Sequence, residues 1–153
     1  MTTLELGVLV STPASATERG VAAVRRLPRI AIVGIAIVAA LLVFGVASII
    51  TDVRTPAMNG RASQDLNALF VILMSGVPAL LGWGLLALLE KFTAKAVIVW
   101  RIIAAVVLLL SLAGPFTGTS ITTDNRLWLA AMHVTVGVVL IGLLPGAGKR
   151  KTP

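Results

Sequence analysis

Residues 30–50 read IAIVGIAIVAALLVFGVASII and contain no charged side chain. Coiled as an α-helix with a rise of about 1.5 Å per residue, this run is about 30 Å long, which matches the hydrocarbon core of a bilayer. It is also longer than the apolar part of a secretory signal peptide, which usually has about 7–15 residues. We therefore expect an uncleaved membrane-spanning helix here.

Three more apolar runs follow the first, and polar or turn-forming segments separate them. Pro56 and Asn59-Gly60 mark the first connection, and Gly114-Pro115 is expected to end the third helix. Asp65 and Asp124 or Asn125 are expected to cap the helices that follow them. The sequence thus predicts an all-α membrane protein, an antiparallel four-helix transmembrane bundle over residues 29–145. The predicted spans are about 30–50, 66–89, 96–113 and 126–144, between a flexible tail at 1–28 and a basic tail at 146–153.

The composition supports a lipid environment. Of the 153 residues, 58% are hydrophobic and only 12% are charged, against about 25% charged in soluble domains. There is no cysteine, which excludes disulfides, thiolate metal sites and thiol redox chemistry. No phosphate loop, dinucleotide fingerprint or hydrolase motif is found. We expect no cofactor, no metal and no catalytic residue.

The net charge of +7 is better explained by membrane topology than by nucleic acid, because no basic patch interleaved with aromatic residues is present. Of the 13 Lys and Arg residues, all but three fall on the side of the two termini if the chain crosses four times. By the positive-inside rule both termini are then cytoplasmic, in a multi-pass protein of the plasma membrane. The three on the other side are Arg54, Arg61 and Arg126.

Stripes of small residues predict which helix faces point to the bundle centre, because membrane helices associate by close packing. The third run is the most uniformly Leu, Val and Ile, and we expect it to be the most exposed to lipid. Trp100 and Trp128 are placed as interfacial aromatic residues, and Trp83 as a packing residue between helices. The expected stripes are Gly34, Leu41, Gly45 and Ser48; Ala68, Ser75, Ala79 and Gly82; and Arg126, Ala130, His133 and Gly137.

His133 is the only histidine and lies about two turns inside the fourth span. An ionisable residue within the membrane is a candidate functional residue, for ligand binding, proton relay or pH sensing. The structural alternative is a histidine hydrogen-bonded to Ser75, Ser111, Thr135 or a backbone carbonyl. With Arg126 and Ser75 it forms the candidate polar cluster.

Other charged and turn-forming residues have structural interpretations. Glu90 is expected to pair locally with Lys95 or Arg101 at the inner interface. Arg126 is a candidate for an outer cluster with the nearby Asp residues, or for interfacial snorkelling. Pro78, with Gly82 and Gly84, either marks a hinge of the second helix or only shapes its packing.

A resemblance to a known family rests on the stretch from Gly82 to Phe92 (GWGLLALLEKF), on Trp100, on residues 110–115 (LSLAGP) and on Met132-His133. In this order they resemble a family of small four-helix membrane proteins from actinobacteria, catalogued as a domain of unknown function. The resemblance covers roughly residues 29–144. It brings Trp83, Glu90, Trp100, Gly114, Pro115 and His133 forward as matching positions and implies no activity for them.

These patterns favour two functions over a third, an enzyme or haem protein, for which ligands and nucleophiles are missing. The first is a non-enzymatic structural or accessory membrane subunit, which acts through helix–helix contacts with a membrane partner or a second copy of itself. The alternative is a transporter or channel component with a polar path near His133, Arg126 and the Pro78 kink. Lipid is the expected surrounding, and nucleic acid is not an expected partner.

Overall fold

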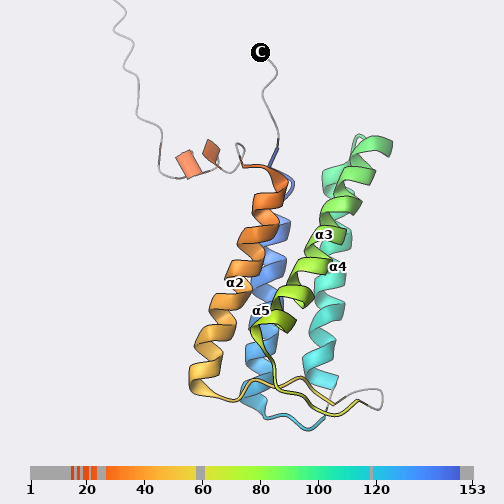
Figure 1. Ribbon diagram of the computed structural model, residues 1–153. Helices are drawn as coiled ribbons and strands as arrows, with labels where there is room; N and C mark the ends of the chain where they lie inside the picture. The colour runs from red at the N-terminus through yellow and green to blue at the C-terminus, as the bar shows by residue number, and fades with distance from the viewer. Residues whose placement is uncertain are drawn as a thin grey trace, which may run out of the picture.

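The computed structural model describes residues 15, 17, 19–20, 22–23, 27–57, 61–117 and 119–148, so most of the predicted tails at 1–28 and 146–153 lies outside the described residues. Four antiparallel helices form an all-α bundle (Figure 1). Each is long and apolar enough to cross a membrane, as the sequence predicts. They are α2 (Arg29–Ile50), α3 (Ala68–Phe92), α4 (Ala96–Thr117) and α5 (Thr123–Leu143).

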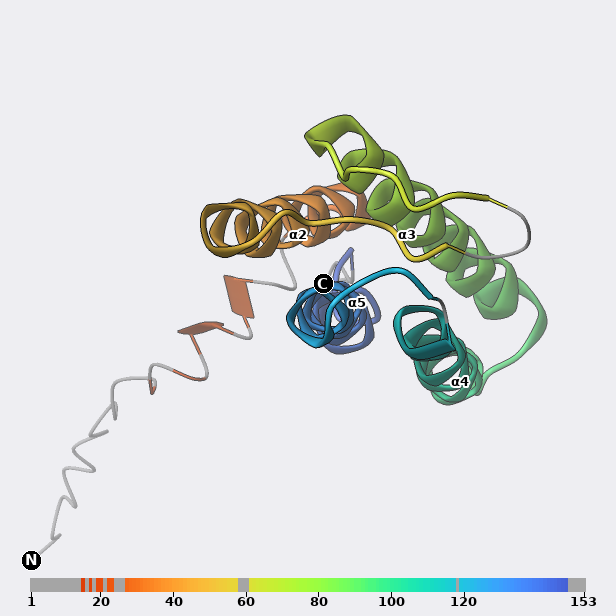
Figure 2. The ribbon, with the colours of Figure 1, turned by 90° about the horizontal axis from the view of Figure 1, so that it is seen from below.

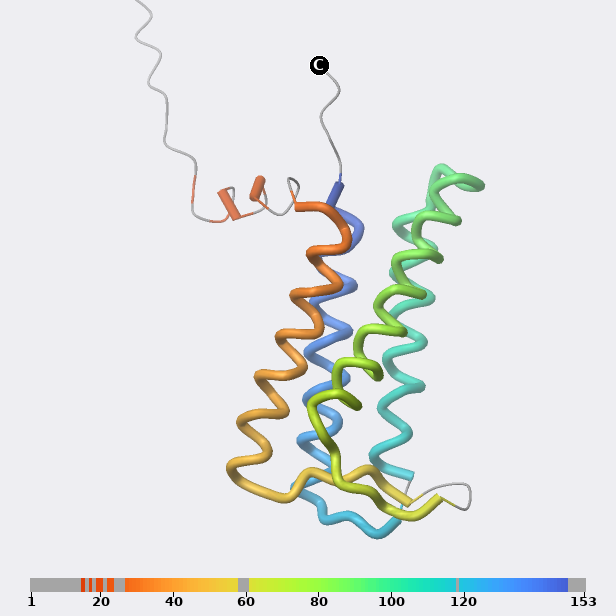
Figure 3. Tube along the Cα trace, in the orientation of Figure 1, coloured from red at the N-terminus to blue at the C-terminus, as the bar shows by residue number. Residues whose placement is uncertain are grey.

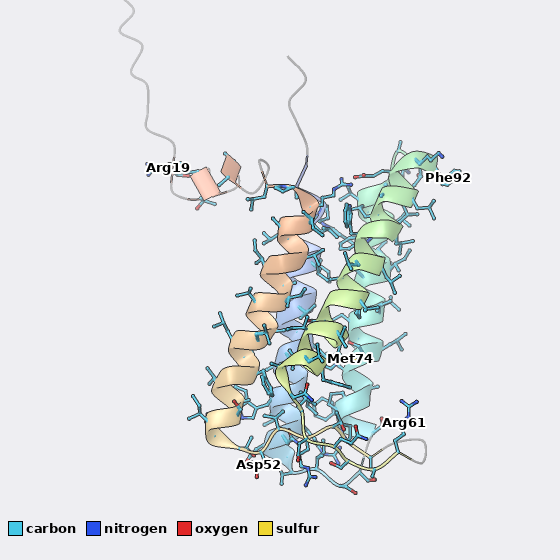
Figure 4. The ribbon with its side chains drawn as sticks, viewed as in Figure 1. Arg19, Asp52, Arg61, Met74 and Phe92 are labelled. Atoms are coloured by element: carbon cyan, nitrogen blue, oxygen red, sulfur yellow. The ribbon has the colours of Figure 1, made fainter. Side chains whose placement is uncertain are left out.

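The helices are arranged in a square when seen along the bundle (Figure 2). α2 and α4 are diagonal to each other, and each packs beside both α3 and α5. The second diagonal pair, α3 and α5, makes only a few contacts. We call the end with Arg29 and the α3–α4 turn the terminal end, and the end with residues 51–67 the loop end. Figure 4 places Phe92 at the terminal end, and Asp52 and Arg61 at the loop end.

α3 and α4 diverge from each other along the bundle. A tight turn at residues 93–95 joins them at the terminal end. Towards the loop end α3 slants towards α2 and away from α4, as the trace in Figure 3 and the end-on view in Figure 2 both show. This divergence separates the two helices in the half of the bundle nearest the loop end.

The hydrophobic core is divided accordingly. At the terminal end, Trp100 of α4 packs in one cluster with buried residues of α2 and α3. At the loop end, Ala40 and Ala47 of α2 pack with Val71 of α3 and Met132 of α5, and no α4 residue belongs to this cluster among the described residues. Core packing at the loop end therefore involves described residues of α2, α3 and α5 and none of α4.

Several predicted helix ends are wrong. α4 continues through Gly114 and Pro115 to Thr117, because a proline late in a helix removes only one backbone donor. Asn67, not Asp65, caps α3, and its side chain accepts a 2.8 Å hydrogen bond from the Phe70 N–H. Thr122, not Asp124 or Asn125, caps α5 by accepting from the Asn125 N–H.

The predicted packing faces have mixed outcomes. On α2, Gly34, Gly45 and Ser48 are exposed, and the buried face consists of Ile32, Val33, Ala36, Ala40 and Ala47. Alanine and β-branched residues thus provide the close approach that glycine was expected to provide. On α3, Ser75 and Ala79 are buried and Ala68 is exposed. On α5, the predicted stripe is half-buried. α4 is the least buried span, at 11%, as its uniform composition predicts.

Candidate functional site: a cavity between three helices

A cavity of about 810 Å³ occupies the space between α3, α4 and α5. Thr55 and Pro56 of the loop between α2 and α3 line its loop end, and Trp100 and Ile141 line the part nearest the terminal end. Along α5 the lining residues run from Leu129 to Ile141, which is about 18 Å of helix. The cavity is therefore elongated along the bundle axis, and its volume falls in the range of about 300–1,000 Å³ typical of ligand sites.

The rim of the cavity lies on α3 and α4, where these helices diverge. Met74 and Leu81 of α3 line it and are 57% and 69% exposed, and Val107 of α4 lines it and is 56% exposed. Figure 4 shows Met74 on α3 at the side that faces α4. Exposed lining residues on two neighbouring helices mark a lateral opening between them, on the apolar surface of the bundle.

His133 lines this cavity from α5. Its Nδ1 lies 2.7 Å from the carbonyl oxygen of Leu129, one turn earlier. Because a carbonyl oxygen only accepts, Nδ1 carries the hydrogen, and Nε2 of the neutral ring is an acceptor. No described residue hydrogen-bonds Nε2. Of the predicted partners, the backbone carbonyl is therefore the one observed.

Two serines line the same cavity and use their hydroxyl hydrogens within their own helices. Ser75 donates to the carbonyl of Val71 at 2.7 Å, and Ser111 donates to the carbonyl of Leu108 at 2.8 Å. Their oxygens keep lone pairs as acceptors. The cavity thus brings Ser75 and His133 of the predicted polar cluster together and adds Ser111.

Pro78 and Pro115 line the cavity as well, and each leaves one backbone carbonyl without its helical hydrogen bond. Neither has an N–H to donate to the carbonyl four residues earlier, at Met74 and Ser111 respectively. Both of those residues also line the cavity. α3 runs unbroken through Pro78, Gly82 and Gly84, and Gly114 is a lining residue next to Pro115.

Trp100 forms part of the cavity wall nearest the terminal end. Its side chain is buried, at 2% exposure, and its Nε1–H donates a 2.7 Å hydrogen bond to the carbonyl of Gly82. Trp100 therefore faces the other helices, whereas a residue of an aromatic belt would face the headgroups. The residue ties α4 to α3, and Trp83 packs half-buried against the same cluster.

Arg126 is not among the residues that line the cavity. Its Nη1 donates to the carbonyls of Pro115 and Phe116 at 3.0 and 2.8 Å. The guanidinium is thus placed at the carboxyl end of α4, where a cation is favoured by the helix dipole. The candidate polar cluster is therefore divided, because His133 and Ser75 line the cavity and Arg126 lies at the carboxyl end of α4.

The predicted pairing of Glu90 with Lys95 or Arg101 is wrong. Glu90 forms a two-point salt bridge with Arg29 of α2, at 2.6 and 2.7 Å. Arg29 also donates from Nε to the carbonyl of Ala147, at 3.3 Å. One arginine therefore connects α2, α3 and the segment that follows α5, while Lys95 and Arg101 are exposed.

Asn125 was expected only as a helix cap and has a different role. It is 2% exposed. Its Nδ2 donates to the carbonyl of Arg54 at 3.0 Å, and its Oδ1 accepts from the Arg54 N–H at 3.3 Å. This paired contact fastens the loop over the end of the bundle, next to the cavity residues Thr55 and Pro56. Its place at a predicted helix start was the only signal in the sequence, and that signal indicates a cap.

Comparison with known proteins places the chain in a family without assigning a function. Among the residues that the structure describes, no group of three or more metal-ligating side chains is found. No curated protein and no solved structure matches the chain significantly. A family model does match residues 20–150, which include all four helices and every residue that lines the cavity. The chain belongs to this family, which is described as a family of unknown function (DUF6069).

Proposed function

We propose that this membrane protein is non-enzymatic and that it holds an apolar molecule of the bilayer, such as an acyl or isoprenoid chain, in the cavity between α3, α4 and α5. The observation that carries the proposal is the cavity's lateral opening, whose rim includes Met74, Leu81 and Val107. Filling a cavity of this size stabilises the complex because the occupant gains dispersion contacts with the wall that an empty space cannot supply. Such binding is also the first step that the transport alternative requires.

The position of Trp100 provides a test, because its indole lines the cavity while only 2% of the residue is exposed. A variant with Trp83 and Trp128 changed to Phe keeps this indole as the only tryptophan, since the chain has three. In vesicles whose acyl chains are brominated, a chain inside the cavity quenches Trp100 fluorescence. A chain outside the bundle is kept away from the indole by the helices.

Two alanines on α4 supply a matched pair of controls. Ala104 lines the cavity one turn beyond Trp100, and the neighbouring Ala105 is exposed and does not line it. Ala104→Phe fills the cavity, and we expect it to reduce the quenching strongly. Ala105→Phe adds the same ring to the outer surface and leaves the quenching unchanged. Absence of quenching in the parent, or equal quenching in the two variants, contradicts the proposal.

A second candidate function is an accessory subunit that packs against a membrane partner or a second copy. The observation that favours it is the low burial of α4, 11% of its span against 28% for α2 and α3. Ile102 of α4 is 60% exposed and Ile49 of α2 is 87% exposed. Cross-linking through a single cysteine at one or the other position compares the outer faces of α4 and α2. Dimers formed through Ile102→Cys and not through Ile49→Cys support this function, and equal yields oppose it.

We infer that both termini are cytoplasmic and that the membrane is the plasma membrane. The terminal end carries Arg29, Lys91 and Lys95, and the loop end carries Arg54 and Arg61. When the basic residues of both tails are added, the terminal end carries more Lys and Arg than the loop end. Reporter fusions at Asn59 and at the carboxyl terminus test the orientation, and a cytoplasmic signal from Asn59 contradicts it.

A further inference from the structure

The hydrogen-bonding character of the cavity indicates which apolar molecules it accepts, an inference that rests on the proposed function. Five lining residues carry a polar side-chain donor: Thr55, Ser75, Trp100, Ser111 and His133. Each of these donors points to a backbone carbonyl of the protein, at distances between 2.7 and 3.3 Å. No Asp, Glu, Lys or Arg is among the described residues that line the cavity.

The acceptors of the cavity, in contrast, are not all used. Nε2 of His133 has no hydrogen-bond partner among the described residues. Ser75 and Ser111 keep lone pairs after donating. The carbonyls of Met74 and Ser111 receive no helical hydrogen bond from Pro78 and Pro115, because proline has no N–H. The wall is thus apolar, uncharged and supplied only with acceptors.

We propose that the cavity binds a neutral amphiphile with a long apolar chain and a single hydrogen-bond donor, such as a hydroxyl or phenol, and that the donor is received by Nε2 of His133. A charged headgroup finds no counter-ion among the described lining residues, and burying it unpaired costs free energy. A donor-less chain leaves the acceptors unpaired. The hydroxyl-bearing chain satisfies both the apolar wall and the acceptor.

The position of His133 supports this assignment. The Nδ1 hydrogen bond to Leu129 fixes which ring nitrogen accepts, as the second hydrogen bond of a histidine generally does. His133 lies nearer the loop-end limit of the α5 lining, Leu129, than the other limit, Ile141. A molecule whose hydroxyl meets His133 therefore has about 12 Å of cavity for its chain towards Ile141.

Photoaffinity labelling in phosphatidylcholine vesicles with two probes tests the proposal. One probe is a hexadecanol with a diazirine in the part of its chain nearest the hydroxyl, so that the diazirine stays inside the cavity, and the other is its methyl ether, which has the same chain without the donor. We expect the alcohol to label Leu81 or Ala104, which line the cavity on the Ile141 side of His133, about five- to tenfold more than the ether, the effect of one hydrogen bond in an apolar site. Equal labelling by the two probes overturns the donor requirement and leaves the proposed function intact. If neither probe labels the cavity, both the donor requirement and the proposed function are overturned.

Variants assign the preference to His133. His133→Phe keeps a ring of similar size without an acceptor, and we expect the preference for the alcohol to disappear while the ether still labels. His133→Gln offers a side-chain donor to Leu129 and a carbonyl to the cavity, and we expect part of the preference to return. Ser48→Ala on the exposed part of α2 is the control and keeps the full preference. A preference unchanged in His133→Phe contradicts the assignment. The comparison of the two probes in the unaltered protein tests the donor requirement even if a variant does not fold.

Discussion

Arg29 and Glu90, which are 61 positions apart in the chain, form a two-point salt bridge with N···O distances of 2.7 and 2.6 Å. Their side chains are only 17% and 32% exposed. The bridge holds α2 against the carboxyl-terminal turn of α3 at the terminal end, while α3 and α4 diverge towards the loop end. It therefore fixes the first residue of α2 relative to the last turn of α3.

Removing this bridge is expected to destabilise the bundle. Arg29→Ala should cost about 2 kcal/mol and Glu90→Gln about 1 kcal/mol, because Arg29 also donates to Ala147 and charge-assisted bonds are the stronger ones. Thermal unfolding in mild detergent measures both. Lys95→Ala, at an exposed position, is the control and should change stability by less than about 0.5 kcal/mol. An effect of Lys95→Ala as large as that of Glu90→Gln would show that general charge, not the bridge, is responsible.

Gly137 of α5 leaves room for the side chain of Leu108 on α4. A Cβ at this position would lie 2.6 Å from Cδ2 and 3.1 Å from Cγ of Leu108. Gly137→Val should therefore destabilise the protein by about 1–3 kcal/mol through overpacking, and adding Leu108→Ala should recover part of this loss. On the same helix, Gly142 has no atom within 4 Å of such a Cβ. Gly142→Val is the control and should be tolerated, and a similar loss at both glycines contradicts the close approach.

Asn125 fastens the loop that covers the loop end of the cavity. Asn125→Ala should cost about 1–3 kcal/mol, because it leaves the Arg54 backbone without its partner in a buried place. Hydrogen exchange should accelerate at residues 53–66 and remain slow in α3. Arg54–Asp65 is an exposed ion pair of the same loop, with side chains 48% and 80% exposed. Asp65→Asn should therefore change little, and loop exchange that responds more to Asp65→Asn than to Asn125→Ala opposes this role.

The sequence was sufficient for the helices and insufficient for the cavity. Long apolar runs predict spans whatever their neighbours are, and all four appear as helices. Pairings across the chain, such as Glu90 with Arg29, depend on helix rotation and slant, which composition does not encode. For the same reason the glycines of α2 misled: they lie on its exposed face, while Ala36 and Ala40 lie on the buried one.

His133 and Ser75 were identified because polar residues are rare in these spans, and that rarity is visible in one sequence. That each side chain uses its hydrogen within its own helix was not visible, since this depends on the side-chain conformation. Asn125 was read as a cap because its position at a helix start suits that role. Only the structure shows it paired with Arg54.

The most direct test of the account concerns what the cavity opens to. The chain has no cysteine, so Met74→Cys places a single spin label on the α3 side of the rim. Leu73 is exposed on the same helix and does not line the cavity, so Leu73→Cys gives the lipid-facing reference. In vesicles, we expect the label at residue 74 to collide with lipid-soluble oxygen about as often as the reference does, and rarely with a water-soluble nickel complex. Strong broadening by the nickel complex at residue 74 and not at residue 73 would mean that the cavity is an aqueous path, and it would contradict a site for apolar molecules of the bilayer.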